Sequence, residues 1–127
     1  MSSIIKLRVE KEELISNSEA YYYLKNAIEK IREETGSVPL IMSRVLEYLK
    51  EFSKIPFEDV EKVRKYLVSK GLKAETIVMI INICPMDIDE LRSLMEFEEK
   101  VYEESVLNEI VNYLKNYCVS GEKHENV

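Results

Sequence analysis

The fold of this chain is decided by residues 71–95, which read GLKAETIVMIINICPMDIDELRSLM. The first half of this stretch carries an apolar stripe at helical spacing, formed by Ile77, Ile80, Ile81 and Cys84. Pro85 lacks a backbone N–H and disfavours the helical conformation of the residue before it. The sequence therefore predicts a helix that ends near Cys84.

A second short helix is predicted directly after this proline. Asp87 occupies the N-cap position and Glu90 follows three residues later, which is a variant of the capping box. The inner face of this helix is formed by Ile88, Leu91, Leu94 and Met95. Because the stop and start signals agree, we predict a sharply defined structural corner made by Pro85, Asp87, Glu90 and Leu91.

Two helices are predicted upstream of the corner. Ser16 and Glu19 form a capping box that opens the first, and Gly36 ends it. Its stripe consists of Ala20, Tyr21, Leu24, Ile28 and Ile31. Pro39 lies in the first turn of the second, where its missing donor costs nothing. The apolar face of that helix consists of Ile41, Val45, Tyr48, Leu49 and Phe52.

Further helices are predicted over residues 57–70 and 103–118, so the predicted fold is all-α, a small helical bundle. Ile5, Leu7 and Val9 are the exception, because they alternate with charged residues as in a half-buried strand. We expect three parts: residues 1–53 with this strand and two helices, residues 54–118 as the bundle, and residues 119–127 as a disordered tail.

Residues 46–95 also carry a family resemblance. They read LEYLKEFSKIPFEDVEKVRKYLVSKGLKAETIVMIINICPMDIDELRSLM. The marks are LxYL at residues 46–49, Lys-Gly-Leu at residues 70–72, and a proline followed by an acidic turn and DELR at residues 89–92. In this order and spacing, the segment resembles the F-type stalk subunits of archaeal DNA-directed RNA polymerases, a family shared with the stalk subunits of the eukaryotic polymerases.

This resemblance implies a fold and a partner. It implies that residues 54–118 adopt an HRDC-like fold, the type found at the C-terminus of helicases and RNase D. It implies a non-catalytic protein that forms a heterodimer with the E-type stalk subunit and joins the polymerase core beside the RNA exit channel. Nascent RNA would be contacted mainly through this partner, and nucleotidyl transfer would belong to the large subunits.

A partner surface follows as a hypothesis. The lone strand has no second alternating run to pair with in this chain, and unpaired backbone groups are costly. One alternative is that residues 2–12 are simply frayed, as most termini are. The other rests on the alternation and on the sheet-containing partner that the resemblance implies: the strand adds to a sheet of the E-type stalk subunit, with the two following helices packed alongside. The predicted partner-binding residues are Ile5, Leu7, Val9, Tyr21, Tyr22, Leu24, Ile28, Ile41, Val45 and Tyr48.

Composition sets broader bounds. The 127 residues suit one domain, or one small domain with an extension. No apolar run approaches the ~20 residues needed to span a bilayer, and the first residues lack the pattern of a secretory signal. The two cysteines lie far apart in sequence, which favours a reducing compartment without a disulfide framework. We therefore expect a cytoplasmic protein with no membrane contact.

Catalytic and metal chemistry are not favoured. His124, Cys84 and Cys118 have no metal-ligand spacing, which favours two buried free thiols and a free imidazole. The acidic residues Glu96, Glu98, Glu99, Glu103 and Glu104 are typical of a solvated surface. No glycine-rich phosphate loop and no activated nucleophile is visible. We expect no enzyme, no cofactor and no metal.

The alternative is a stand-alone HRDC-type module that binds single-stranded nucleic acid. Lys62, Arg64 and Lys65 are candidates for a weak RNA contact. They alternate with acidic residues, however, and the net charge of −6 opposes binding through counterion release. The corner resembles a helix-hairpin-helix element but lacks its glycines, and Asp87 would repel a phosphate there.

Overall fold

The computed structural model describes residues 13–118. The predicted strand around Ile5, Leu7 and Val9, the predicted tail at residues 119–127 and His124 lie outside this range. The described part holds six helices: α1 (Asn17–Thr35), α2 (Leu40–Phe52), α3 (Phe57–Ser69), α4 (Ala74–Ile83), α5 (Ile88–Ser93) and α6 (Glu104–Leu114). The all-α prediction is confirmed for these residues. Within them, no helix is both long and apolar enough to cross a membrane.

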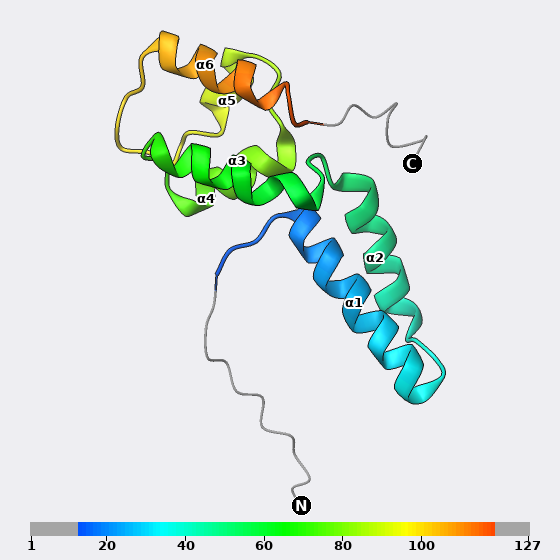
Figure 1. Cartoon of the computed structure of the whole chain (residues 1–127). Coiled ribbons are helices and arrows are strands. Elements are labelled where there is room, and N and C mark those ends of the chain that lie inside the picture. Colours follow the sequence, from blue (N-terminus) through cyan, green and yellow to red (C-terminus); the bar gives the residue numbers. More distant parts are fainter. Residues whose placement is uncertain (1–12, 119–127) are drawn as a thin grey trace, which may run out of the picture.

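Helices α1 and α2 form an antiparallel hairpin that projects from the rest of the molecule (Figure 1). The predicted capping box at the start of α1 is confirmed: the Ser16 N–H donates to Glu19 Oε1 at 2.8 Å, and the Glu19 N–H donates to Ser16 Oγ at 3.3 Å. Gly36 ends α1 at φ +81°, a conformation that glycine adopts without strain. Pro39 then precedes α2 as its N-cap.

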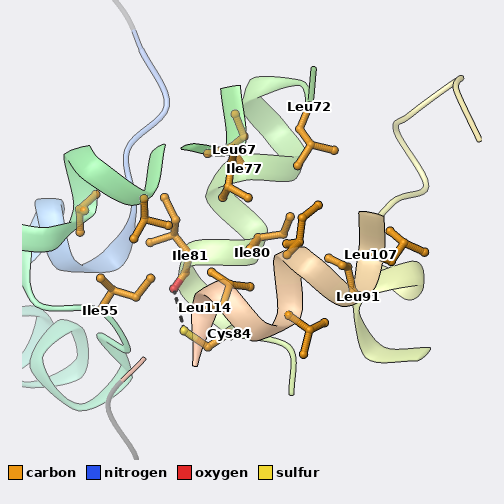
Figure 2. Close-up of a cluster of buried hydrophobic side chains, with 14 residues drawn as sticks. Ile55, Leu67, Leu72, Ile77, Ile80, Ile81, Cys84, Leu91, Leu107 and Leu114 are labelled. Atoms are coloured by element: carbon orange, nitrogen blue, oxygen red, sulfur yellow. Dashed lines mark hydrogen bonds between the residues drawn. The ribbon is translucent and has the colours of Figure 1, made fainter. Parts of the chain in front are cut away.

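Helices α3 to α6 form a bundle around one apolar core. Figure 2 shows its side chains, contributed by all four helices and by the segments between them. Val63, Leu67, Ile80, Leu91 and Ile110 are completely buried. Nothing in the contacts tests the predicted HRDC-like likeness or the predicted domain boundary at residue 54, and both stay predictions.

The predicted corner lies between α4 and α5. Helix α4 ends at Ile83, and Cys84 takes a left-handed conformation at φ 53° directly before the buried Pro85. Asp87 caps α5, since its Oδ1 accepts from the Glu90 N–H at 2.8 Å. The reciprocal bond differs from the prediction. Glu90 accepts from the Met86 N–H at 2.5 Å, because the extended backbone at Asp87 brings that earlier amide into reach.

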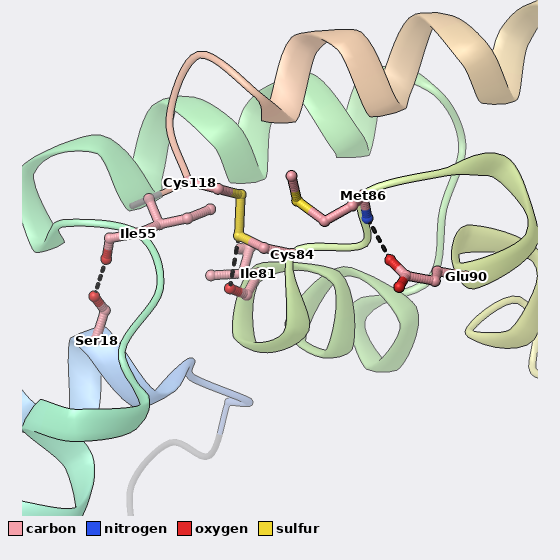
Figure 3. The surroundings of a disulfide bond; sticks show 7 residues. All are labelled: Ser18, Ile55, Ile81, Cys84, Met86, Glu90 and Cys118. Carbon is pink, nitrogen blue, oxygen red and sulfur yellow. Dashed lines mark hydrogen bonds between the residues drawn. A yellow bond between two sulfur atoms is a disulfide. The ribbon is translucent and has the colours of Figure 1, made fainter. Parts of the chain in front are cut away.

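The prediction of free thiols is wrong, because Cys84 and Cys118 form a disulfide (Figure 3). The predicted last helix is also too long: α6 ends at Leu114, and the chain then turns so that the Cys118 N–H donates to Leu114 O at 2.9 Å. This turn brings the two Cα atoms within 6.2 Å, a separation that a disulfide spans. A sequence separation of 34 residues concealed that proximity. The inference of a reducing compartment loses its basis.

Candidate partner-binding surface on the helical hairpin

Helix α2 carries two apolar stripes, and within residues 13–118 only one of them packs against another helix. Met42, Leu46 and Leu49 are half-buried and lie on the side that meets α1. The second stripe, here called the outer stripe, lies about 100° further around the helix, as its positions require. It consists of Ile41, Val45, Tyr48 and Phe52, which are 67%, 41%, 58% and 43% exposed.

The outer stripe is continuous along the whole helix. Its members are spaced by four, three and four residues, which is the spacing of a seam that packs against another element. The rings of Tyr48 and Phe52 contact each other, with centroids 4.6 Å apart. Leu40, 66% exposed, extends the apolar surface at the start of the helix. A row of large apolar side chains in water is typical of an interaction site.

The predicted partner-binding residues on α1 are placed differently. Ile28 is buried, and Tyr21 and Leu24 are half-buried, because they lie on the stripe that packs against α2. Tyr22 is 41% exposed but stacks on Phe57 with centroids 3.9 Å apart. The structure thus places Ile41, Val45 and Tyr48 on an open surface, whereas Ile28 mainly holds the hairpin together.

Sequence reasoning missed a cleft at the root of the hairpin. The cleft has a volume of about 380 Å³. Its lining includes Tyr21, Tyr22 and Lys25 from α1, Lys50 from α2, and Pro56 and Phe57 at the start of α3. No sequence pattern pointed to it, since its walls come from three segments whose proximity only the fold creates.

The hairpin is fixed to the bundle by polar contacts around the first turn of α1. Glu19 Oε1 accepts from both the N–H and the hydroxyl of Ser16, and it also pairs with Arg64 on α3. The Asn17 N–H donates to Asn82 Oδ1 on α4 at 2.8 Å. One carboxylate therefore caps α1 and also ties it to α3. The outer stripe is presented at a defined angle to the bundle.

The three candidate RNA-contacting residues do not share one free surface. Arg64 is bound to Glu19 and only 20% exposed. Lys62 and Lys65 are exposed one turn apart, and the Lys62 ammonium lies 5.6 Å from the centre of the Tyr117 ring. The predicted weak RNA contact therefore involves at most the two lysines, and it stays a prediction.

A polar network on the bundle joins α3 to α6. The Tyr66 and Tyr113 rings stack with centroids 3.6 Å apart, and the Tyr66 hydroxyl donates to Glu109 Oε2 at 2.7 Å. Glu109 also pairs with Lys70. The hydrogen bond from Lys70, and then that from Tyr66, lowers the pKa of Glu109. Burial, followed by the bond to Glu109, raises the pKa of Tyr66. Because these groups satisfy one another's hydrogen bonds and charges, the network stabilises the packing of α3 against α6.

Over residues 13–118, no three His, Cys, Asp or Glu side chains gather in a way that could hold a metal ion. The cysteines are joined to each other. The candidate binding feature is the apolar outer stripe of α2, which runs along the whole helix.

Two comparisons with known proteins give matches to this chain. The family model described as RNA polymerase Rpb4 matches residues 14–118, which include both the hairpin and the bundle. Among curated proteins, the DNA-directed RNA polymerase subunit Rpo4 of Methanocaldococcus jannaschii is 31% identical over 83 residues. That alignment covers 65% of this chain and 68% of the relative.

Proposed function

Because the chain belongs to the RNA polymerase Rpb4 family, we propose that it is a non-catalytic stalk subunit of an archaeal DNA-directed RNA polymerase. In this role it forms a heterodimer with the E-type stalk subunit, and the pair attaches to the polymerase core near the RNA exit channel. There it supports initiation and elongation, while nascent RNA is contacted mainly through the partner.

The observation that carries this proposal is the outer stripe on α2. Its four members are 41–67% exposed although they lie on a well-formed helix with a second stripe already packed on α1. Burying such side chains is favourable by roughly 25 cal/mol for each Å² removed from water. A partner that covers the stripe supplies this burial. The fixed angle of the hairpin limits the ordering cost of binding.

The direct test is binding to the E-type stalk subunit of the same organism, measured by calorimetry with the full chain. We expect a stable 1:1 complex. Replacing Ile41, Val45 and Tyr48 together by Ser should weaken the complex at least tenfold. The matched control is Val68→Ser, on an exposed position of α3 (58%), which should leave the affinity unchanged. Failure of the wild-type chain to bind, or equal affinities for the two variants, would contradict the proposal.

The N-terminal residues make a separate contribution in this proposal. Ile5, Leu7 and Val9 keep the alternation expected of a strand that adds to a sheet edge. Deleting residues 2–12 should weaken the heterodimer by an order of magnitude or more. The unfolding midpoint of the bundle should stay unchanged, since its core lies within residues 55–114. An unchanged affinity after the deletion would remove strand addition from the proposal and leave the outer stripe as its support.

A further inference from the structure

Residues 95–103 join α5 to α6 on the side of the bundle that faces away from the hairpin (Figure 1). This segment, here called the link, is pinned to the bundle at two points. Glu98 Oε2 accepts from the Lys73 N–H at 2.8 Å and from the buried Thr76 hydroxyl at 2.6 Å. The Tyr102 hydroxyl donates to Lys70 O at 2.9 Å.

Both contacts satisfy hydrogen-bonding groups at the ends of helices. Helix α4 has no cap from its own N-cap side chain, so the Glu98 carboxylate supplies the acceptor and the negative charge that a helix N-terminus favours. Tyr102 satisfies a carbonyl just beyond the end of α3. The expectation that all five glutamates of this acidic stretch are solvated is therefore wrong for Glu98, which is half-buried.

The pins hold the remaining side chains of the link outward. Phe97 is 54% exposed and Val101 is 93% exposed. The link cannot turn these apolar groups inward without breaking the bonds of Glu98 and Tyr102. Single exposed apolar residues are common on protein surfaces. Here, however, two of them are presented on a loop that the bundle fixes in place.

Charge surrounds these two side chains. The exposed neighbours carry four carboxylates, on Glu96, Glu99, Glu103 and Glu104. Two lysines lie beside these carboxylates: the Lys100 ammonium is 5.3 Å from the centre of the Tyr102 ring, and the Lys73 ammonium is 3.9 Å from Glu99 Oε1. With the half-buried Glu98 included, five carboxylates and two lysines give this surface a local charge of about −3, which repels nucleic acid and anionic membranes and attracts a basic protein.

We propose that the link is a second docking surface, which binds a protein whose surface has an apolar hollow ringed by lysine and arginine. Phe97 and Val101 enter the hollow, and the glutamates pair with its basic rim. The link lies on the side of the bundle that faces away from the hairpin (Figure 1), so a partner on the hairpin leaves the link accessible. The chain then joins a partner on its hairpin to a second, basic protein.

The test is photo-crosslinking from position 101 of the full chain, with p-benzoylphenylalanine, in extract of the native host. The matched control carries the same probe at Val68, which is 58% exposed on α3. We expect an adduct from position 101 that the control does not give. Peptide mapping should locate it on a protein segment rich in lysine and arginine. Raising NaCl from about 0.1 to about 0.5 M should lower the yield severalfold, because charge pairing is screened.

Two sets of changes sharpen the result. Reversing Glu96, Glu99 and Glu103 to Lys should lower the adduct yield at least tenfold, and Phe97→Ser should lower it severalfold. All four positions are exposed, and an unchanged thermal midpoint verifies that the variants fold. The proposal is overturned by no adduct above the Val68 control, by an adduct on nucleic acid or on an acidic segment, or by a yield that ignores the charge reversal.

Discussion

The hairpin is built from helices of 19 and 13 residues and the bundle from helices of 6 to 13 residues, but only the bundle has a complete core. Helices α3, α4 and α6 each bury three or four residues, whereas α2 buries none and Ile28 is the one buried apolar side chain of α1. The bundle therefore derives its stability from its own packing. The hairpin leaves the outer stripe exposed, as the proposed partner-binding role requires. Substitutions should separate the two regions.

The largest loss of stability is expected from breaking the disulfide, because this bond joins the end of α4 to the segment after α6. In the chain-entropy account, a bridge across 34 residues stabilises the folded state by about 4 kcal/mol. Reduction with a dithiol, or the Cys118→Ser variant, should lower the denaturant midpoint correspondingly. The same reductant should not affect a variant that lacks both cysteines. A wild-type midpoint that reductant leaves unchanged would show that the bridge contributes nothing.

A cavity in the bundle should come next. Leu91 is completely buried at the corner, so Leu91→Ala should destabilise the chain by about 3 kcal/mol. Its control is Glu99→Ala, whose side chain is 93% exposed and whose effect should stay below about 0.5 kcal/mol. Urea denaturation of the oxidised chain measures both. Equal losses from the two substitutions would mean that Leu91 does not anchor this core.

The joint between the two regions should give a smaller loss. Glu19→Gln removes the charge that pairs with Arg64 and weakens the cap of α1, so we expect a loss of about 1–2 kcal/mol. Hydrogen exchange should also quicken in the first turn of α1. The exposed Glu33→Gln, later in the same helix, is the control and should change neither measurement. Similar results for the two glutamates would show that Glu19 is not the joint.

The parts that sequence predicts well are those whose causes are local. Pro85 and Asp87 act on their immediate neighbours, and so do Ser16, Glu19 and Gly36. This explains why both ends of α1 and the corner, except for the reciprocal bond of Glu90, are found as predicted. The missed features join distant segments. The disulfide spans 34 residues, the bond from Asn17 to Asn82 spans 65, and the cap that Glu98 gives to α4 spans 25.

Sequence alone does not separate the residues of the outer stripe from those that pack the hairpin, because that distinction also depends on contacts between segments. Periodicity identifies apolar positions on α2 but does not say which of two adjacent stripes meets α1. Leu49 was therefore grouped with Ile41, Val45 and Tyr48, although it lies half-buried on the inner stripe. The same periodicity places Ile28 among the predicted partner-binding residues, whereas the structure buries it on the side of α1 that meets α2. Only the packing of α1 on α2 separates these roles.

The smallest effect on stability should come from the outer stripe, and one chemical change tests it in both helices. Ile41 on α2 is 67% exposed, whereas Ile28 on α1 is 3% exposed. Ile28→Ala should cost about 2–4 kcal/mol because it leaves a cavity. Ile41→Ala should stay within about 0.5 kcal/mol, since it opens no cavity and alanine favours the helix. Denaturant unfolding of the free chain gives both values.

With the E-type partner present, Ile41→Ala should instead weaken the complex, because the methyl groups it removes would have been buried there. If Ile41→Ala destabilised the free chain as much as Ile28→Ala, the outer stripe would already be covered within this protein and the hairpin would not need a partner.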